Sequence, residues 1–79
     1  MISAYILAKL ETGREEEIFK RLKALSDVKR AAATFGVYDL VVEVEFEAIE
    51  DLDEFIFSKL RKISGITETV SVIVSKEIV

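Results

Sequence analysis

The chain reads GVYDLVVEVEF from Gly36 to Phe46, and this stretch decides the fold. Apolar residues recur at every second position from Tyr38, which is the period of a strand with one buried face. Gly36 suits a tight turn, and Val28–Phe35 before it is a second, alanine-rich strand candidate. Because few residues separate Val28–Phe35 from Tyr38–Phe46, the two segments predict an antiparallel hairpin.

One strand and one helix are predicted before this hairpin. Ile2–Leu10 alternates between apolar and mixed positions, as a strand does. Thr12-Gly13-Arg14-Glu15 has the form of a capping box, in which Thr12 caps a helix and Glu15 reaches back to it. Apolar residues then follow at helical spacing, so we expect this helix to end near Ser26-Asp27.

A second helix and a last strand are predicted after the hairpin. Asp51 opens the helix with acidic residues that favour its dipole, and Gly65 ends it. Ile66 to about Glu77 is a strand rich in valine. The order is therefore βαββαβ, the ferredoxin-like pattern of an α+β fold. We expect a single domain over residues 1–79, with the first and third strands central and both helices on one face of a four-stranded antiparallel sheet.

The other face of the sheet is predicted to be too apolar to meet water. Tyr5, Leu7, Val41 and Ile73 are expected there, among polar side chains. Such a face suits packing against a second copy across a two-fold axis, so we expect a dimer. The alternative is a monomer with scattered exposed apolar residues. The composition favours the dimer, because 51% of the residues are apolar, more than one small core can hide.

The composition also speaks against several classes of function. The chain lacks cysteine, histidine and tryptophan, which removes disulfides, thiolate zinc sites and the commonest general base. A net charge of −4 with scattered basic residues speaks against binding of nucleic acid. We expect no cofactor, no metal site, no membrane span and no signal peptide, and hence a cytoplasmic protein that is not an enzyme. The acidic run from Glu43 to Glu54 lacks the spacing of a calcium loop and is interpreted as solvated surface.

Two motifs give the chain a family resemblance. Gly36-Val37-Tyr38-Asp39-Leu40 before an alternating strand, and Gly65-Ile66-Thr67-Glu68-Thr69 before a valine-rich strand, resemble the effector domain of the leucine-responsive regulatory protein (Lrp/AsnC) family. The opening Ile2-Ser3-Ala4-Tyr5-Ile6 fits as well, so the resemblance spans essentially the whole chain. No stretch corresponds to the DNA-binding domain that usually precedes this domain in the family. We therefore expect the stand-alone, RAM-type form.

The resemblance implies how the domain assembles and where it binds a ligand. In the family this domain dimerises through its sheets, and dimers assemble into rings, commonly octamers, with amino acids bound between neighbouring dimers. The expected partners are thus other copies of the chain, an amino acid, and full-length Lrp/AsnC-type regulators. Two alternatives stay open: a small enzyme of the dimeric α+β barrel kind, and an ACT-like regulatory domain.

Five residues are candidates for the ligand site, each with a structural alternative. Gly36 bends the turn and could also open backbone N–H groups to a ligand carboxylate. Asp39 could accept from a ligand ammonium group, or bond to nearby backbone. Tyr38 could line the pocket, or pack in the core with the other residues of its strand face. The resemblance implies that the hydroxyls of Thr67 and Thr69 contact the ligand, whereas strand propensity alone also explains them.

Overall fold

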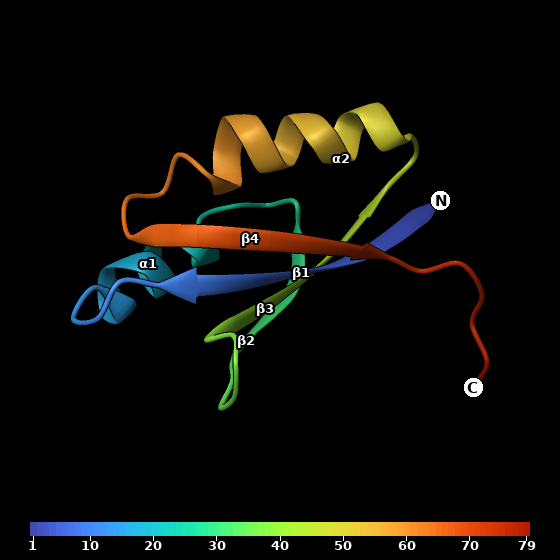
Figure 1. The fold of residues 1–79 in the computed structure, drawn as a ribbon. Coiled ribbons are helices and arrows are strands. Elements are labelled where there is room, and N and C mark those ends of the chain that lie inside the picture. Colours follow the sequence, from blue (N-terminus) through green and yellow to red (C-terminus); the bar gives the residue numbers. More distant parts are fainter.

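The computed structural model describes residues 1–79 and confirms the ferredoxin-like order (Figure 1). Strands and helices follow one another as β1 Ile2–Leu10, α1 Glu15–Lys23, β2 Val28–Ala33, β3 Leu40–Phe46, α2 Ile49–Phe55 and β4 Ile66–Ile73. The last turns of the second helix, Ile56–Leu60, are π-helical. The single sheet has the order β2-β3-β1-β4 and every pairing is antiparallel, so the first and third strands are central, as predicted.

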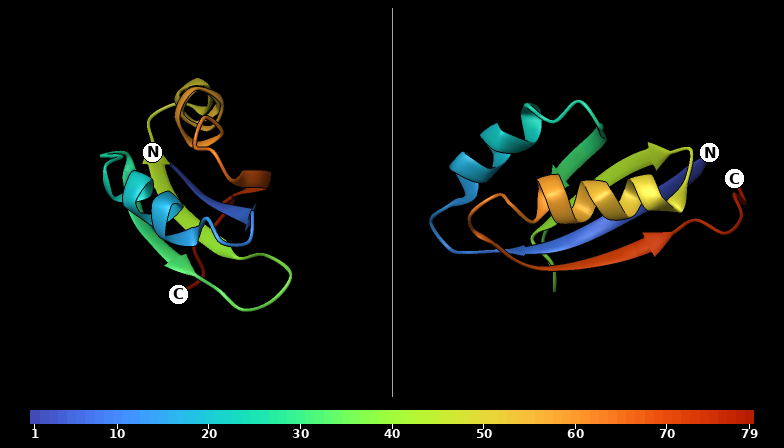
Figure 2. Two further views of the ribbon diagram at one scale, coloured as in Figure 1. Left: turned by 90° about the vertical axis from the view of Figure 1, so that its left-hand side faces the viewer. Right: turned by 90° about the horizontal axis from the view of Figure 1, so that it is seen from above.

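Both helices lie against one face of this sheet (Figure 2). The core between the two layers is apolar throughout, and it contains no buried polar or charged residue. Removal of these side chains from water is the main force that holds the layers together. The strands contribute alternate residues to the core, and the helices contribute residues at helical spacing: Ala4, Ile6, Ala8, Leu40, Val42 and Val44 from the sheet, with Ile18, Leu22, Leu52, Phe55, Ile56, Leu60 and Ile63 from the helical side.

The predicted capping box of α1 was wrong. The helix begins at Glu15 with Arg14 as the N-cap, and no side chain caps it. The reason is Gly13, which turns the chain at φ +91°, so that the Glu15 carboxylate accepts the N–H of Gly13 at 3.0 Å instead of reaching back to Thr12. The helix also ends earlier than predicted, at Lys23, because its last residues tighten into bonds such as the one from Leu25 N–H to Leu22 O.

Three further boundaries differ from the predicted ones. The second helix begins at Ile49 rather than at Asp51, after an extended residue at Ala48. The hairpin connection is longer than predicted and spans residues 34–39, because Thr34 closes it: its N–H bonds to Asp39 O at 2.9 Å and its hydroxyl bonds to Tyr38 O at 2.7 Å. The strand β4 ends at Ile73 instead of near Glu77; Val74 N–H still donates to Ser3 O at 2.9 Å, and the residues after it leave the sheet (Figure 1).

The uncovered face of the sheet carries three of the four residues predicted for it. Tyr5 and Leu7 alternate with the buried residues of β1, and Val41 pairs with Leu7. We call this side the open face. Val70 and Val72 share it, because they pair with Leu7 and Tyr5.

The predicted position of Ile73 on the open face was wrong, because Ile73 pairs with Ala4 and lies on the helix side. Ile66 is half-buried on the helix side, and strict alternation from it along the strand would place Ile73 on the open face. A bulge between Ile66 and Glu68 adds one residue, Thr67, opposite the step from Lys9 to Leu10. Since side chains alternate along a strand, one extra residue exchanges the two faces.

Candidate ligand-binding site

The end of β1 brings together residues that lie far apart in the sequence. Tyr38 and Asp39 lie just before β3, and Thr67 and Thr69 lie at the beginning of β4, so both groups flank the last residues of the central strand β1. Four of the five predicted site residues therefore lie around one end of β1. We call this region the strand junction.

Asp39 is held at the junction by hydrogen bonds to β1. Its backbone N–H donates to Ala8 O at 2.9 Å, and its side-chain Oδ2 accepts the backbone N–H of Leu10 at 2.9 Å. One of the two carboxylate oxygens of Asp39 therefore bonds to nearby backbone, which was the alternative to a role in ligand binding. The other oxygen, Oδ1, accepts no hydrogen bond from the protein and is available to a ligand.

Tyr38 does not pack in the core, so that interpretation was wrong. It precedes β3, is half-buried and lies outside the core cluster. Its hydroxyl donates to Glu68 Oε2 at 3.4 Å, and the ammonium of Lys9 lies 5.8 Å from the centre of its ring. The ring therefore spans the junction from β3 towards β4.

The two threonines differ in their surroundings. Thr67 is the extra residue of the bulge, and its hydroxyl donates to Lys9 O at 3.2 Å. Thr69 pairs with Ala8 and is half-buried on the helix side. Glu68, between them, pairs with Lys9 on the open face. Thr69 therefore lies on the opposite face of the sheet from Lys9, Glu68 and the Tyr38 ring.

Gly36 lies apart from this group. It sits in the connection between β2 and β3, which projects from the body of the protein (Figure 1). Its φ is +139°, and no atom lies within 4 Å of the position that a Cβ would occupy. The neighbours Phe35 and Val37 are strongly exposed. The structure shows the turn role of Gly36 and does not bring it into the junction within one protomer.

Lys9 and Glu68 are junction residues that the sequence analysis did not single out. Their pairing is set by the register of β4 against β1, which the alternation within one strand does not reveal. The position of Glu68 between two predicted ligand residues was the one available signal.

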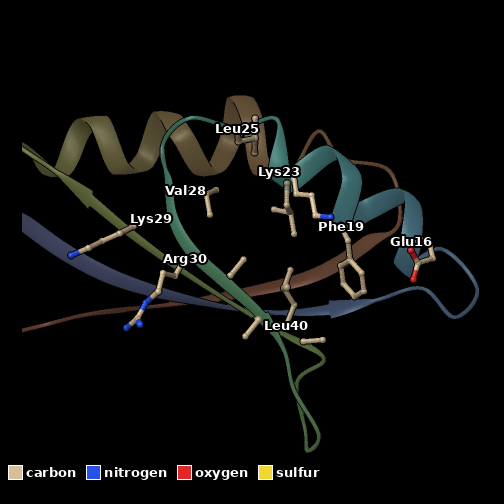
Figure 3. Close-up of a pocket in the computed structure, with 12 residues that line it drawn as sticks. Glu16, Phe19, Lys23, Leu25, Val28, Lys29, Arg30 and Leu40 are labelled. Carbon is tan, nitrogen blue, oxygen red and sulfur yellow. The ribbon is translucent and has the colours of Figure 1, made fainter.

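The surface also has a groove away from the junction. A groove of about 560 Å³ lies between α1 and β2, with Phe19, Leu25, Val28 and Leu40 among its lining residues (Figure 3). None of the predicted ligand residues lines it. The structure also has no group of three or more acidic residues placed to hold a metal ion, and no helix long and apolar enough to cross a membrane.

The fold and the sequence agree with one family of regulatory domains. Residues 3–79 match the family model described as the Lrp/AsnC ligand binding domain, and the chain therefore belongs to this family. This domain is the ligand-binding part of transcription regulators, and the ferredoxin-like fold and the family predicted from the sequence are both confirmed.

Individual relatives place the chain more closely. The HTH-type transcriptional regulator FL11 of Pyrococcus furiosus is 31% identical over 75 residues, which are 95% of this chain and 49% of that protein. The chain spans about half the length of the curated relatives that it matches. The crystal structure of the hypothetical protein PHS023 from Pyrococcus horikoshii is 40% identical with a TM-score of 0.86, covering 98% of this chain and 93% of that one.

A more distant structure shares the fold. The transcriptional regulator NMB0573 of Neisseria meningitidis, solved as a complex with L-Met, is 20% identical with a TM-score of 0.91. It covers 98% of this chain, which corresponds to 51% of that protein.

Proposed function

We propose that this chain is an oligomeric amino-acid-binding module that regulates transcription regulators or metabolism through its assembly. The observation that carries the proposal is the strand junction, where Tyr38, Asp39, Thr67 and Thr69 meet at one end of β1 in a domain of the Lrp/AsnC ligand-binding family. The L-Met complex of the Neisseria relative supports an amino acid as the class of ligand. The relatives are transcriptional regulators, which supports a regulatory and not a catalytic role.

The open face supports the oligomer. Tyr5, Val70 and Val72 are each more than a third exposed, and Leu7 lies between Val70 and Val41. A contiguous apolar patch of this kind marks an interaction surface. A second copy related by a two-fold axis presents the same patch and covers it. Ile73 is excluded from the centre of this interface by its position on the helix side, and it can contribute only at the edge of β4.

The strand junction is where we place the ligand. Its residues are half-buried or exposed, so a ligand there is open to solvent in one protomer. A neighbouring dimer closes the site and can supply the projecting loop with Gly36. This arrangement accounts for Gly36 as a ligand residue, and it favours a ring of dimers such as an octamer.

Regulation then follows from linkage. A ligand that contacts two dimers stabilises the assembly that places them correctly, and it does so only by its difference in affinity between assemblies. Full-length regulators with the same domain could join such assemblies, which would pass the amino-acid signal to DNA-bound proteins.

Binding to a panel of the twenty free L-amino acids tests the proposal, with melting temperature as a screen and calorimetry as the measurement. Asp39→Asn keeps an oxygen for Leu10 N–H and removes the charge, so we expect binding to weaken roughly tenfold without loss of fold. Glu77→Gln in the tail is the matched control and should bind like the unchanged protein. If no amino acid shifts the melting temperature or gives heat, the proposal is wrong.

A further inference from the structure

Lys9 lies between two acidic residues in a row across the strand junction. In β4 it pairs with Glu68. On the β3 side, Asp39 bonds to the residues just before and just after Lys9, through Ala8 O and Leu10 N–H. The row therefore carries negative, positive and negative charge at the strand junction.

Lys9 nevertheless forms no ion pair, although opposite charges that face each other across strands ordinarily attract. The five salt bridges of the protein, all with nitrogen–oxygen distances of 4.0 Å or less, do not include Lys9, Glu68 or Asp39. Arg30 and Glu43 differ from Lys9 and Glu68 in this respect. They also pair directly across two strands, but they do form a salt bridge, at 3.0 Å.

Tyr38 explains the separation of Lys9 from Glu68. Its hydroxyl bonds to Glu68 Oε2 at 3.4 Å, and its ring faces the Lys9 ammonium at 5.8 Å. One aromatic side chain thus holds a carboxylate at its hydroxyl end and a cation at its face. Both charges remain open to a further partner of opposite sign.

We propose that Lys9 and Glu68 are specificity-determining residues that read the two charges of a free α-amino acid. Lys9 contacts the ligand carboxylate, and Glu68 contacts the ligand ammonium group. This inference rests on the proposed function and adds a requirement to it, namely that the ligand is a zwitterion with both groups unblocked.

The arrangement suits this task because the charges are already separated. If Lys9 and Glu68 were paired with each other, a ligand would have to break that ion pair before it could form its own. With Tyr38 between them, the two groups are preorganised, so less of the binding free energy is lost on binding. Charge-assisted hydrogen bonds are also the stronger kind, which favours a charged ligand over a blocked analogue.

The location fits the proposed assembly. The next residues on the open face, Leu7 and Val70, are apolar, so the row begins where the apolar patch ends. A second copy on the open face would cover the patch and leave the row at its rim. A rim shielded on one side by protein strengthens charge recognition relative to open water.

Binding of blocked amino acids tests the roles of Lys9 and Glu68 independently of the proposed function. Each of the twenty free L-amino acids is compared by calorimetry with its methyl ester, which lacks the carboxylate, and its N-acetyl derivative, which lacks the ammonium group. For an amino acid that binds, we expect the ester and the N-acetyl form to bind at least roughly tenfold more weakly than the free form.

Two variants then assign each charge. In Lys9→Gln, the ratio of the dissociation constants of the methyl ester and the free amino acid should fall towards one. The corresponding ratio for the N-acetyl form should stay as it is in the unchanged protein. Glu68→Gln should reduce the preference over the N-acetyl form and leave that over the ester. Lys76→Gln and Glu77→Gln, which change the same charges in the tail, should keep both preferences.

Each outcome has one meaning. If a free amino acid binds and both variants keep the preferences of the unchanged protein, this inference is wrong while the proposed function stands. The same holds if the two variants only change the oligomer mass, because Lys9 and Glu68 would then form ion pairs between subunits. If none of the twenty amino acids binds the unchanged protein, the proposed function fails and this inference fails with it.

Discussion

The carboxylate of Asp39 accepts the backbone N–H of Leu10 at 2.9 Å, so a residue outside β3 extends the hydrogen bonding between β3 and β1. The bond lies next to the bulge at which β1 changes register with β4. It therefore links the position of the candidate ligand residues to the irregularity of the sheet.

Removal of this bond should destabilise the domain modestly. Asp39→Ala leaves Leu10 N–H without its acceptor, and we expect a loss of about 1 kcal/mol in the free energy of unfolding. Asp39→Asn retains an acceptor and should lose less than half as much. Urea unfolding at a fixed protein concentration measures both, and equal losses for the two variants would show that the bond contributes nothing.

Gly65 is predicted to be the least replaceable glycine. Its φ is +103°, and a Cβ there would lie 2.8 Å from Ile18 Cδ1 and 3.2 Å from Arg14 Cβ. Gly65→Ala combines backbone strain with overpacking, so we expect a loss of about 3 kcal/mol. Gly36→Ala meets no atom within 4 Å and should cost about 1 kcal/mol from the backbone alone. Thermal melts of the two variants compare them, and a smaller effect at Gly65 would contradict the packing described for the loop before β4.

Two residues of the π-helical turn, one buried and one exposed, should differ in how much they stabilise the protein. Leu60 is fully buried, and Leu60→Ala should cost about 3 kcal/mol through lost burial and a cavity. Phe57 in the same turn is 59% exposed and lies beneath the guanidinium of Arg61, 5.2 Å from the ring centre. Phe57→Ala should therefore cost less than about 1 kcal/mol. Chemical denaturation gives both values, and a reversed order would mean that the second helix packs differently.

A charge on the open face should dissociate the oligomer without unfolding the protomer. Val72 is 49% exposed in the protomer, so Val72→Asp should change the fold little. In a dimer it would bury an unpaired carboxylate, which raises the dissociation constant by roughly a hundredfold or more. Ile49→Asp adds the same charge on the helix side and should leave the mass unchanged. Light scattering after size exclusion detects the difference, and loss of assembly in both variants or in neither would reject the open face as the interface.

The sequence was sufficient for the fold because its strongest patterns are local. The alternation in Leu40–Phe46 and the helical spacing from Ile18 to Leu22 each report one buried face, and these faces meet in the observed core. Helix starts were less predictable, since Gly13 directs the Glu15 carboxylate to a different N–H than a capping box requires.

The candidate site was only partly predictable, for a physical reason. The family resemblance singled out Tyr38, Asp39, Thr67 and Thr69 as ligand candidates, and the structure brings these four together around one end of β1. The pairing of Lys9 with Glu68 depends on the register between β1 and β4, and the true face of Ile73 depends on the bulge at Thr67. A bulge is a feature of two paired strands, so the alternation of one strand cannot reveal it.

The most direct test is the mass of the unchanged protein under native conditions, measured at micromolar concentration with and without the twenty amino acids. The account predicts an even multiple of the 8.9 kDa protomer, and a change in the distribution of masses with the amino acids that bind. A single 8.9 kDa species under every condition would contradict it, because the open face would then have no second copy and the strand junction no neighbouring dimer.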